Sequence, residues 1–151
     1  MPVTYLQEPL FQVKKEATEL ARQDWEETTK FKDSHPFEID WDLYELLESI
    51  GSLLVFTARD GEKLVGYFSV IKTPDMHSKG RFFFTNDAIF LHKDYRKGLA
   101  GVGLIKFVEK CLREDGCDHL QIAFTTEYNI GKLLKRLGYH EIEIRFEKRL
   151  V

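Results

Sequence analysis

A basic, glycine-rich turn between an apolar strand and an amphipathic helix constrains this chain more than any other feature. The run Phe82–Leu91 is apolar, β-branched and aromatic, and residues 91–108 continue as LHKDYRKGLAGVGLIKFV. A strand that ends in such a turn directs backbone N–H groups and a helix N-terminus at one point, which is how a protein holds a pyrophosphate without a metal. The sequence therefore predicts a cofactor that carries phosphates. The alternative is a turn that merely connects a strand to a helix.

The composition is that of one domain with a sizeable core. The chain has 151 residues, 43% of them hydrophobic, and a formal net charge of −3, which argues against a general nucleic-acid-binding protein. No apolar run approaches the roughly 20 residues of a membrane span, and residues 1–8 lack the basic and apolar regions of a signal peptide. We therefore expect a single cytoplasmic domain over residues 1–151, with no nucleic-acid or membrane partner.

The two cysteines, Cys111 and Cys117, lie six positions apart around an expected helix end. We interpret them as free thiols of an intracellular protein, with a disulfide as the alternative. No second pair of Cys or His residues has the spacing of zinc ligands, so no metal site is expected.

Hydrophobic periodicity and turn residues divide the chain into helices and strands. Helices are predicted over residues 11–30, 41–50, the stretch from the basic turn to Gly116, and 130–137. Strands are predicted over residues 52–59, 63–72, 81–91, 118–124 and 139–150. Asp40 and Gly51 are expected to begin and end the second helix, and Asp60-Gly61 predicts a hairpin turn. The order α-α-β-β-β-α-β-α-β predicts a mixed α/β (α+β) fold with one parallel pair of strands.

The basic turn and its surroundings resemble the GNAT superfamily of N-acetyltransferases. That family follows a strand with Arg or Gln, two residues, Gly, one residue, Gly or Ala, and then a helix. Residues 96–101, RKGLAG, fit this spacing, with Leu99 where the family usually has its first Gly. Leu137-Gly138-Tyr139 resembles the family's Leu-Gly-Phe, and the element order matches over almost the whole chain. The overall style resembles the small GNAT proteins found in bacteriophage genomes, which would place the enzyme in a host cytoplasm.

The resemblance implies acetyl-coenzyme A as the cofactor, no metal, and a mixed central sheet with helices on both faces. The backbone amides of residues 97–102 would bind the pyrophosphate, and the strand before the turn would pair with the pantetheine arm. The amide near Leu91 would polarise the thioester carbonyl. The cofactor-binding residues expected on this basis are Ile89, Phe90, Leu91, Arg96, Lys97, Gly98, Leu99, Ala100, Gly101 and Val102.

Acyl transfer to an amine needs a base, because the ammonium must lose a proton before attack. Asp87 is the candidate, since it lies on the strand expected to hold the cofactor, with Asn86 beside it to orient a water. The alternative is a carboxylate that merely faces solvent. Many family members protonate the departing thiolate with a Tyr of the last helix, and that position is Leu134 here. Tyr128 is the candidate replacement; the alternatives are a packing role for Tyr128 and protonation of the thiolate by water.

Three residues are candidates for contact with the acceptor. Trp41 and Tyr44 belong to the N-terminal helices, which in this family form one wall of the acceptor site, and His77 lies in a polar loop before the central strand. Acidic residues near that wall would attract a cationic amine: Glu26, Glu27, Glu38, Asp40 and Asp42. The alternatives are core packing for the aromatic residues, an exposed loop His without a role, and a solvated acidic face.

The leading hypothesis is an acetyl-coenzyme A-dependent N-acetyltransferase that acts on a primary amine by direct attack in a ternary complex. The alternative is a non-catalytic protein of GNAT fold that binds an acyl-coenzyme A or a partner protein, which Leu99 and Leu134 motivate. A nucleotide site at residues 98–103 is a weaker reading, because the order of the glycines does not suit a dinucleotide turn. The sequence leaves open whether the acceptor is a small molecule or a peptide, and whether the protein is a monomer or a homodimer.

Overall fold

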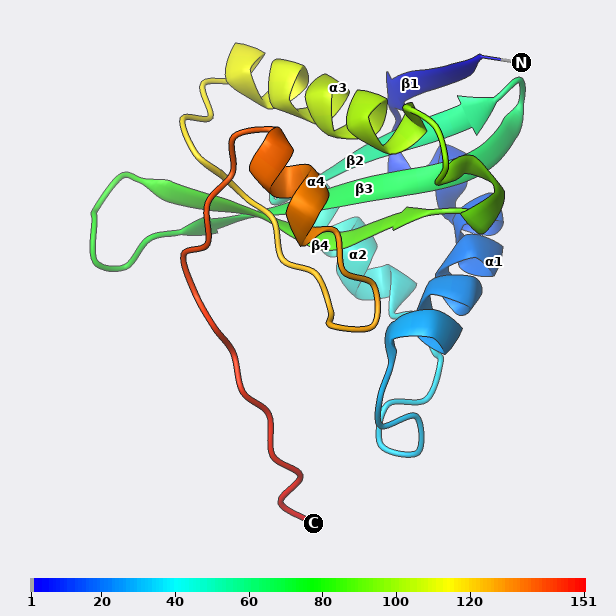
Figure 1. Ribbon diagram of the computed structural model, residues 1–151. Coiled ribbons are helices and arrows are strands. Elements are labelled where there is room, and N and C mark those ends of the chain that lie inside the picture. The colour runs from blue at the N-terminus through cyan, green and yellow to red at the C-terminus, as the bar shows by residue number, and fades with distance from the viewer. Residues whose placement is uncertain (1) are drawn as a thin grey trace.

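The computed structural model describes residues 2–151 and shows a five-stranded sheet with helices on both faces (Figure 1). The strands are β1 (Val3–Gln7), β2 (Leu53–Asp60), β3 (Lys63–Pro74), β4 (Phe82–Leu91) and β5 (Leu120–Gln121). The helices are α1 (Leu10–Thr28), α2 (Trp41–Ser49), α3 (Ala100–Glu114) and α4 (Gly131–Arg136). The strands lie in the order β1-β2-β3-β4-β5, and all neighbours are antiparallel except β4 and β5. The predicted mixed α/β fold is confirmed.

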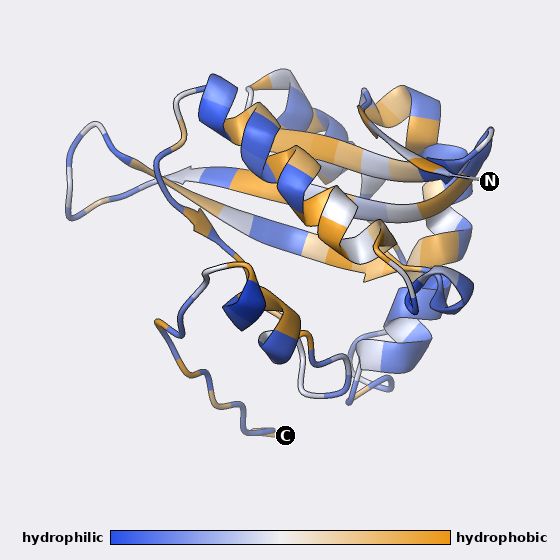
Figure 2. Ribbon diagram, turned by 45° about the horizontal axis from the view of Figure 1, so that its top comes forward, coloured by the Kyte–Doolittle hydropathy of each residue, from blue (hydrophilic) through white to orange (hydrophobic). Residues whose placement is uncertain are grey.

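Each face of the sheet has its own apolar core. The core under α3 and α4 buries Phe56, Phe68, Phe84, Leu91, Leu104, Val108 and Leu134, among others. The opposite face packs against α1 and α2 through two clusters that include Leu10, Val13, Leu53 and Val55, and Leu20, Leu64, Tyr67 and Phe90. In Figure 2 apolar and polar residues alternate along α3. Its buried residues, Leu104, Ile105, Val108 and Leu112, belong to the core between α3 and the sheet, as expected for an amphipathic surface helix.

Local signals in the sequence begin and end several elements as predicted. The Asp40 carboxylate accepts the Leu43 amide at 2.9 Å and caps α2, and Gly51 ends that helix with a φ of 77°. Gly61 takes a φ of 61° in the turn between β2 and β3. Both glycines have backbone angles that other residues adopt only with strain. Both cysteines are free thiols, as predicted.

The two ends of the chain differ from the prediction. β1 was not predicted; it is a short edge strand that pairs antiparallel with β2, and five residues carry little alternation. The predicted strand over residues 139–150 is wrong, because that segment is extended but pairs with no strand in the described residues. It leaves the body of the protein (Figure 1), with Ile144 76% and Phe146 94% exposed. Alternation makes a segment fit a strand, but a strand also needs a free edge beside it.

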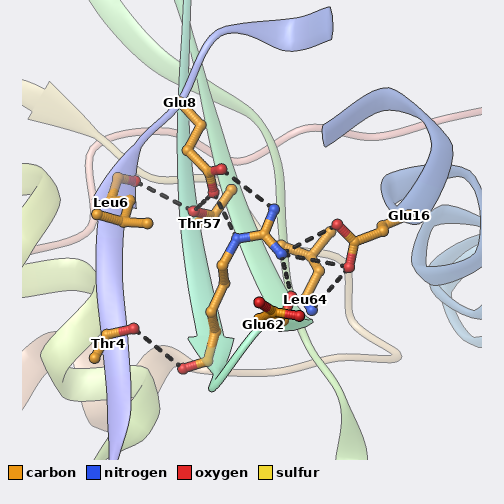
Figure 3. A network of polar contacts seen from close by, with 8 residues as sticks. Thr4, Leu6, Glu8, Glu16, Thr57, Glu62 and Leu64 are labelled. Atoms are coloured by element: carbon orange, nitrogen blue, oxygen red, sulfur yellow. Dashed lines mark hydrogen bonds and ion pairs between the residues drawn. The ribbon is translucent and has the colours of Figure 1, made fainter. Parts of the chain in front are cut away.

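A partly buried ion-pair network joins β1 and α1 to the hairpin of β2 and β3 (Figure 3). Arg59 lies at its centre, with Nε donating to Glu8 at 2.9 Å and Nη1 to Glu16 at 3.1 Å. Nη1 also donates to the Glu62 carbonyl at 2.6 Å, and Glu16 accepts the Leu64 amide. The network therefore sets where α1 lies across the sheet.

Candidate active site

The turn after β4 presents a row of backbone N–H groups that are not used within the described part of the protein fold. Within residues 2–151, the amides of residues 97–102 donate to no protein acceptor, and the first bond of α3 runs from the Gly103 amide to the Leu99 carbonyl at 2.8 Å. Free amides at a helix N-terminus, with the positive end of the helix dipole behind them, form a site for an anion. The predicted pyrophosphate-binding residues are therefore brought together in a geometry that suits that role.

No side chain of the described residues blocks access to the backbone amides of the turn before α3. A Cβ at Gly98 would meet no atom within 4 Å, and one at Gly101 would meet only Leu91 Cδ2, at 3.8 Å. Leu99, which stands where the family usually has a glycine, is 80% exposed. Its side chain projects into solvent instead of filling the turn. A phosphate group thus has access to the amides despite the missing glycine.

β4 and β5 separate beside this turn. They pair at two positions, Phe84 with Leu120 and Thr85 with Gln121. The Asn86 side chain then donates to the Ala123 carbonyl at 2.8 Å and accepts the Ala123 amide at 2.6 Å. A side chain thus replaces the next backbone pair. Beyond it, no strand of the described residues pairs with this edge of β4, which includes Ile89, Phe90 and Leu91. The gap suits an extended cofactor arm.

Asp87 lies in a β-bulge at the point where β4 diverges. Ser69 of β3 stands opposite Ala88, whereas Val70 stands opposite Asn86, so Asp87 is an extra residue in β4. Bulges redirect side chains and are common beside active sites. This one sends the Asp87 side chain to the face covered by α1 and α2, the predicted acceptor side.

Tyr44 and Ser69 hold one oxygen of the Asp87 carboxylate. The Tyr44 hydroxyl donates to Oδ2 at 2.5 Å and the Ser69 hydroxyl at 3.2 Å. Oδ1 has no hydrogen-bond partner within the part of the chain that the structure describes, and Asp87 is exposed. Burial, and then the Asp87 carboxylate, raises the pKa of the Tyr44 hydroxyl. The carboxylate is thus oriented by two neutral donors and has one oxygen free for a proton.

A second carboxylate, Asp24 of α1, belongs to the same wall and was missed in the sequence. It accepts the Tyr67 hydroxyl at 2.9 Å, and burial raises its pKa against the opposing effect of hydrogen bonds from Tyr67 and Thr28. Its charge also raises the pKa of Tyr44. The signal was available, because Asp24 follows Leu20 by one helical turn on the buried side of α1. A carboxylate at such a position needs a partner.

Tyr128 lies against the separated end of β4. Its ring is 6.2 Å from that of Phe90, between centroids. Burial raises the pKa of the Tyr128 hydroxyl, while the charge of Arg96 and a hydrogen bond from the Leu91 amide lower it in part. The predicted donor to the thioester, the Leu91 amide, therefore faces the Tyr128 hydroxyl. Leu134, at the family's usual tyrosine position, is buried in the core under α3.

Of the two remaining predicted acceptor-site residues, Trp41 lies beside Tyr44, whereas His77 lies in a distant turn. Trp41 packs on Tyr44, with ring centroids 5.7 Å apart, and lines a hollow of about 480 Å³ with Glu38, Asp40 and Asp42. His77 lies in the exposed turn between β3 and β4, where its amide donates to Asp75. That turn projects beyond the sheet (Figure 1), and the structure does not bring His77 to Asp87.

Two kinds of feature are absent from residues 2–151. No group of three or more His, Cys, Asp or Glu residues is placed to hold a metal ion. Among these residues there is also no helix with both the length and the apolar character needed to span a membrane.

Solved structures of known proteins share this fold. Solved structures of similar fold include ribosomal-protein-alanine N-acetyltransferase from Brucella melitensis biovar Abortus 2308 (TM-score 0.71, 18% identity, covering 99% of this chain and 100% of that one). Glucosamine-6-phosphate N-acetyltransferase from Arabidopsis thaliana has a TM-score of 0.74 and 14% identity, with full coverage of both chains. AAC(6')-Iy in complex with the bisubstrate analogue CoA-S-monomethyl-acetylneamine has a TM-score of 0.69 and 19% identity, with 99% coverage of each.

Sequence comparison identifies the family. No curated protein sequence matches the chain. The model of the acetyltransferase (GNAT) family matches residues 15–139, which include both carboxylates, the separated end of β4 and the amide-rich turn. The chain therefore belongs to the acetyltransferase (GNAT) family.

Proposed function

We propose that this acetyltransferase moves an acetyl group from acetyl-coenzyme A to a primary amine, by direct attack within a ternary complex. One observation carries the proposal: the free amides of residues 97–102 continue into the open edge of β4, which ends beside Asp87. A candidate phosphate site, an unpaired strand edge suited to an extended arm and a candidate base thus follow one another along β4 and the turn after it. The family uses acetyl-coenzyme A, and AAC(6')-Iy, of similar fold, binds a coenzyme A analogue.

Each part of the path has residues suited to one part of the cofactor. The amides of residues 97–102 would bind the pyrophosphate, with Lys97 beside them. The backbone of Ile89, Phe90 and Leu91 would pair with the pantetheine arm in the gap left by β5. When bound, the cofactor supplies the activated acetyl group; the protein orients it and handles the protons.

Two protons must move. Asp87 Oδ1 would take a proton from the acceptor ammonium, directly or through a water, which frees the nitrogen lone pair to form the new C–N bond. As the C–S bond breaks, the Tyr128 hydroxyl would give its proton to the departing thiolate sulfur. The raised pKa of Tyr128 keeps that hydroxyl protonated at neutral pH, as a general acid requires.

An acyl-enzyme on cysteine does not suit this geometry. Cys111 lies eleven residues after the first residue of α3, so it is about 16 Å along the helix from the amide-rich turn. Cys117 lies beyond the far end of the helix. Burial raises the pKa of both thiols, which lowers the fraction of reactive thiolate at neutral pH.

The wall around Asp87 favours a cationic acceptor. Asp24 and Asp87 lie on it, and the hollow beside Trp41 adds further carboxylates. The relatives in the comparison include enzymes named for aminoglycosides, glucosamine 6-phosphate and a ribosomal-protein alanine. We infer an amine acceptor that is a small molecule or a peptide, used in the cytoplasm, where thiols stay reduced.

Calorimetric titration tests the cofactor. Acetyl-coenzyme A and desulfo-coenzyme A should bind with micromolar affinity, and ATP should not. Gly101→Glu should abolish this binding in a folded protein, because a carboxylate beside the amides repels the pyrophosphate, whereas Gly101→Gln has similar bulk without the charge and should bind more tightly than Gly101→Glu. Unchanged affinity in Gly101→Glu would place the cofactor elsewhere.

Turnover tests the base. In an acceptor screen that follows free thiol, Asp87→Asn should lower kcat by about 10²-fold or more with little change in cofactor affinity. Asp75→Asn, at a half-buried carboxylate in the turn between β3 and β4, is the matched control and should keep wild-type turnover, because an Asn side-chain oxygen can still accept the His77 amide. Binding without acceptor-dependent thiol release in the wild type would instead support a non-catalytic acyl-coenzyme A-binding protein.

A further inference from the structure

The Arg96 side chain is directed toward α1 and the end of β4, and not toward the expected pyrophosphate site. The family motif places its charge at the pyrophosphate, but Nη2 binds the Glu27 carboxylate at 2.9 and 3.1 Å, and Nε donates to the Leu91 carbonyl at 2.7 Å. Glu27 belongs to the end of α1 and Leu91 is the last residue of β4. The guanidinium thus joins α1 to the end of the strand that borders the gap.

The same guanidinium lies against two aromatic rings. Its carbon is 5.1 Å from the centroid of Phe90 and 4.6 Å from that of Tyr128. Arg pairs with a carboxylate through a planar fork, and its flat face stacks on aromatic rings. With its edge held by Glu27 and Leu91, the group cannot rotate freely, so it offers the Tyr128 ring a fixed surface.

We propose that Arg96 is a positioning residue for Tyr128, and that it acts at the thioester end of the cofactor path instead of at the pyrophosphate. The Glu27 pair fixes the guanidinium, the guanidinium fixes the Tyr128 ring, and the ring places its hydroxyl beside the Leu91 amide, where the thiolate departs. The inference rests on the proposed function.

Lys97 provides the contrast. It follows Arg96 directly, is exposed, and forms no ion pair within residues 2–151. It also carries the first of the free amides. The charge that serves the phosphates is therefore that of Lys97, and the two neighbouring cations have separate tasks.

The test compares Arg96→Gln with Lys97→Gln by calorimetry with coenzyme A and by turnover. Arg96→Gln should keep coenzyme A affinity within about threefold and lower kcat by about 10- to 100-fold, as misplacement of a catalytic group does. Lys97→Gln should weaken coenzyme A binding by about 10-fold and leave kcat within about twofold. Arg96→Gln added to Tyr128→Phe should cost little more than Tyr128→Phe alone, because residues that act as a unit are not additive.

Glu27→Gln is the second variant. It keeps the stacked guanidinium but removes the charge that orients it, so kcat should fall in the same direction by a smaller factor. If Arg96→Gln does not fold, Glu27→Gln is compared with Lys97→Gln in the same binding and turnover measurements. The proposal is overturned if Arg96→Gln weakens coenzyme A binding as Lys97→Gln does while kcat stays constant, or if the two losses at Arg96 and Tyr128 multiply.

A readout without turnover separates this proposal from the proposed function. Because the Arg96 charge lowers the pKa of Tyr128, Arg96→Gln should shift the phenolate absorbance titration of that tyrosine to higher pH, with Tyr128→Phe spectra subtracted. An unshifted titration overturns the placement of Tyr128 by Arg96. A shifted titration in a protein that transfers no acetyl group would support that placement and refute the proposed activity.

Discussion

The same substitution at two glycines of α3 should change stability in opposite directions. Replacing a helical Gly with Ala normally stabilises a protein by about 0.5–1 kcal/mol, since Ala restricts the unfolded chain. At Gly101 the new Cβ would touch only Leu91 Cδ2 at an ordinary 3.8 Å. At Gly103 it would overlap Tyr5 Oη and lie 2.5 Å from Tyr5 Cζ. Gly101→Ala should therefore gain stability and Gly103→Ala should lose it.

The size of the loss follows from how Tyr5 is held. Its hydroxyl donates to the Ala100 carbonyl at 3.0 Å, its ring stacks on Phe107 at 6.1 Å, and β1 pairs it with Ala58. Moving the ring breaks a hydrogen bond worth about 1 kcal/mol, and overpacking costs about 1–3 kcal/mol. After the gain from Ala is set against these, Gly103→Ala should destabilise by about 1–3 kcal/mol, a fall in Tm of several degrees.

Urea and thermal unfolding of the two variants measure the difference. In a Tyr5→Ala background the clash is gone, so adding Gly103→Ala should become neutral or stabilising, with a coupling of about 2 kcal/mol between the two positions. A Gly103→Ala protein as stable as Gly101→Ala, or no coupling with Tyr5, would refute the reasoning that the Tyr5 ring requires a glycine there.

Three further predictions concern charge and the gap between strands. Burial alone would raise the pKa of Glu8, but hydrogen bonds from Arg59 and Thr57 outweigh it and lower that pKa below 4.5. The Glu8 carboxylate therefore stabilises the fold above that pH, and this stabilisation is lost as the pH falls. Tm should drop more steeply below about pH 5 in the wild type than in Glu8→Gln. Burial raises the pKa of Asp24 above 3.8, so its charge costs stability as pH rises, and Asp24→Asn should gain Tm relative to wild type between about pH 4 and 7. Asn86→Ala removes both bonds to Ala123 and should weaken coenzyme A binding about 10-fold, as calorimetry would show.

Local chemistry explains why much of the fold was predictable. Asp40, Gly51 and Gly61 act within a few residues of their own positions, so their effects are legible in the sequence. Failures occur where pairing decides the outcome. The residues of β1 pair with residues 49 or more positions away, and residues 139–150 have the pattern of a strand without a partner.

The candidate site divides in the same way. The amide-rich turn was predictable because it lies in one segment of the motif. The side chains that orient the catalytic groups were not: Tyr44 lies 43 residues from Asp87, and Glu27 lies 69 residues from Arg96. Periodicity within a helix or strand does not reveal which distant charge a side chain will meet. The prediction that Arg96 serves the pyrophosphate followed from its neighbours in sequence, whereas its contacts come from α1.

The bulge at Asp87 also resets the alternation of β4. In a regular strand Phe84 and Phe90 would share a face, yet Phe84 packs under α3 with Leu91 while Phe90 packs under α1. The extra residue puts the two halves of the strand out of phase. Deleting Asp87 would leave Asn86 and Ala88 adjacent, opposite Val70 and Ser69, so Phe84 and Phe90 would still face different cores. Straightening the bulge with all of its residues kept would instead turn Phe90 toward α3 and Leu91 toward α1, which exchanges residues between the two cores. The Asp87 carboxylate thus belongs to the residue that keeps the two cores separate along β4: drawing Asp87 into the regular ladder would disturb the fold, whereas deleting it would remove the carboxylate and keep the division of residues between the cores.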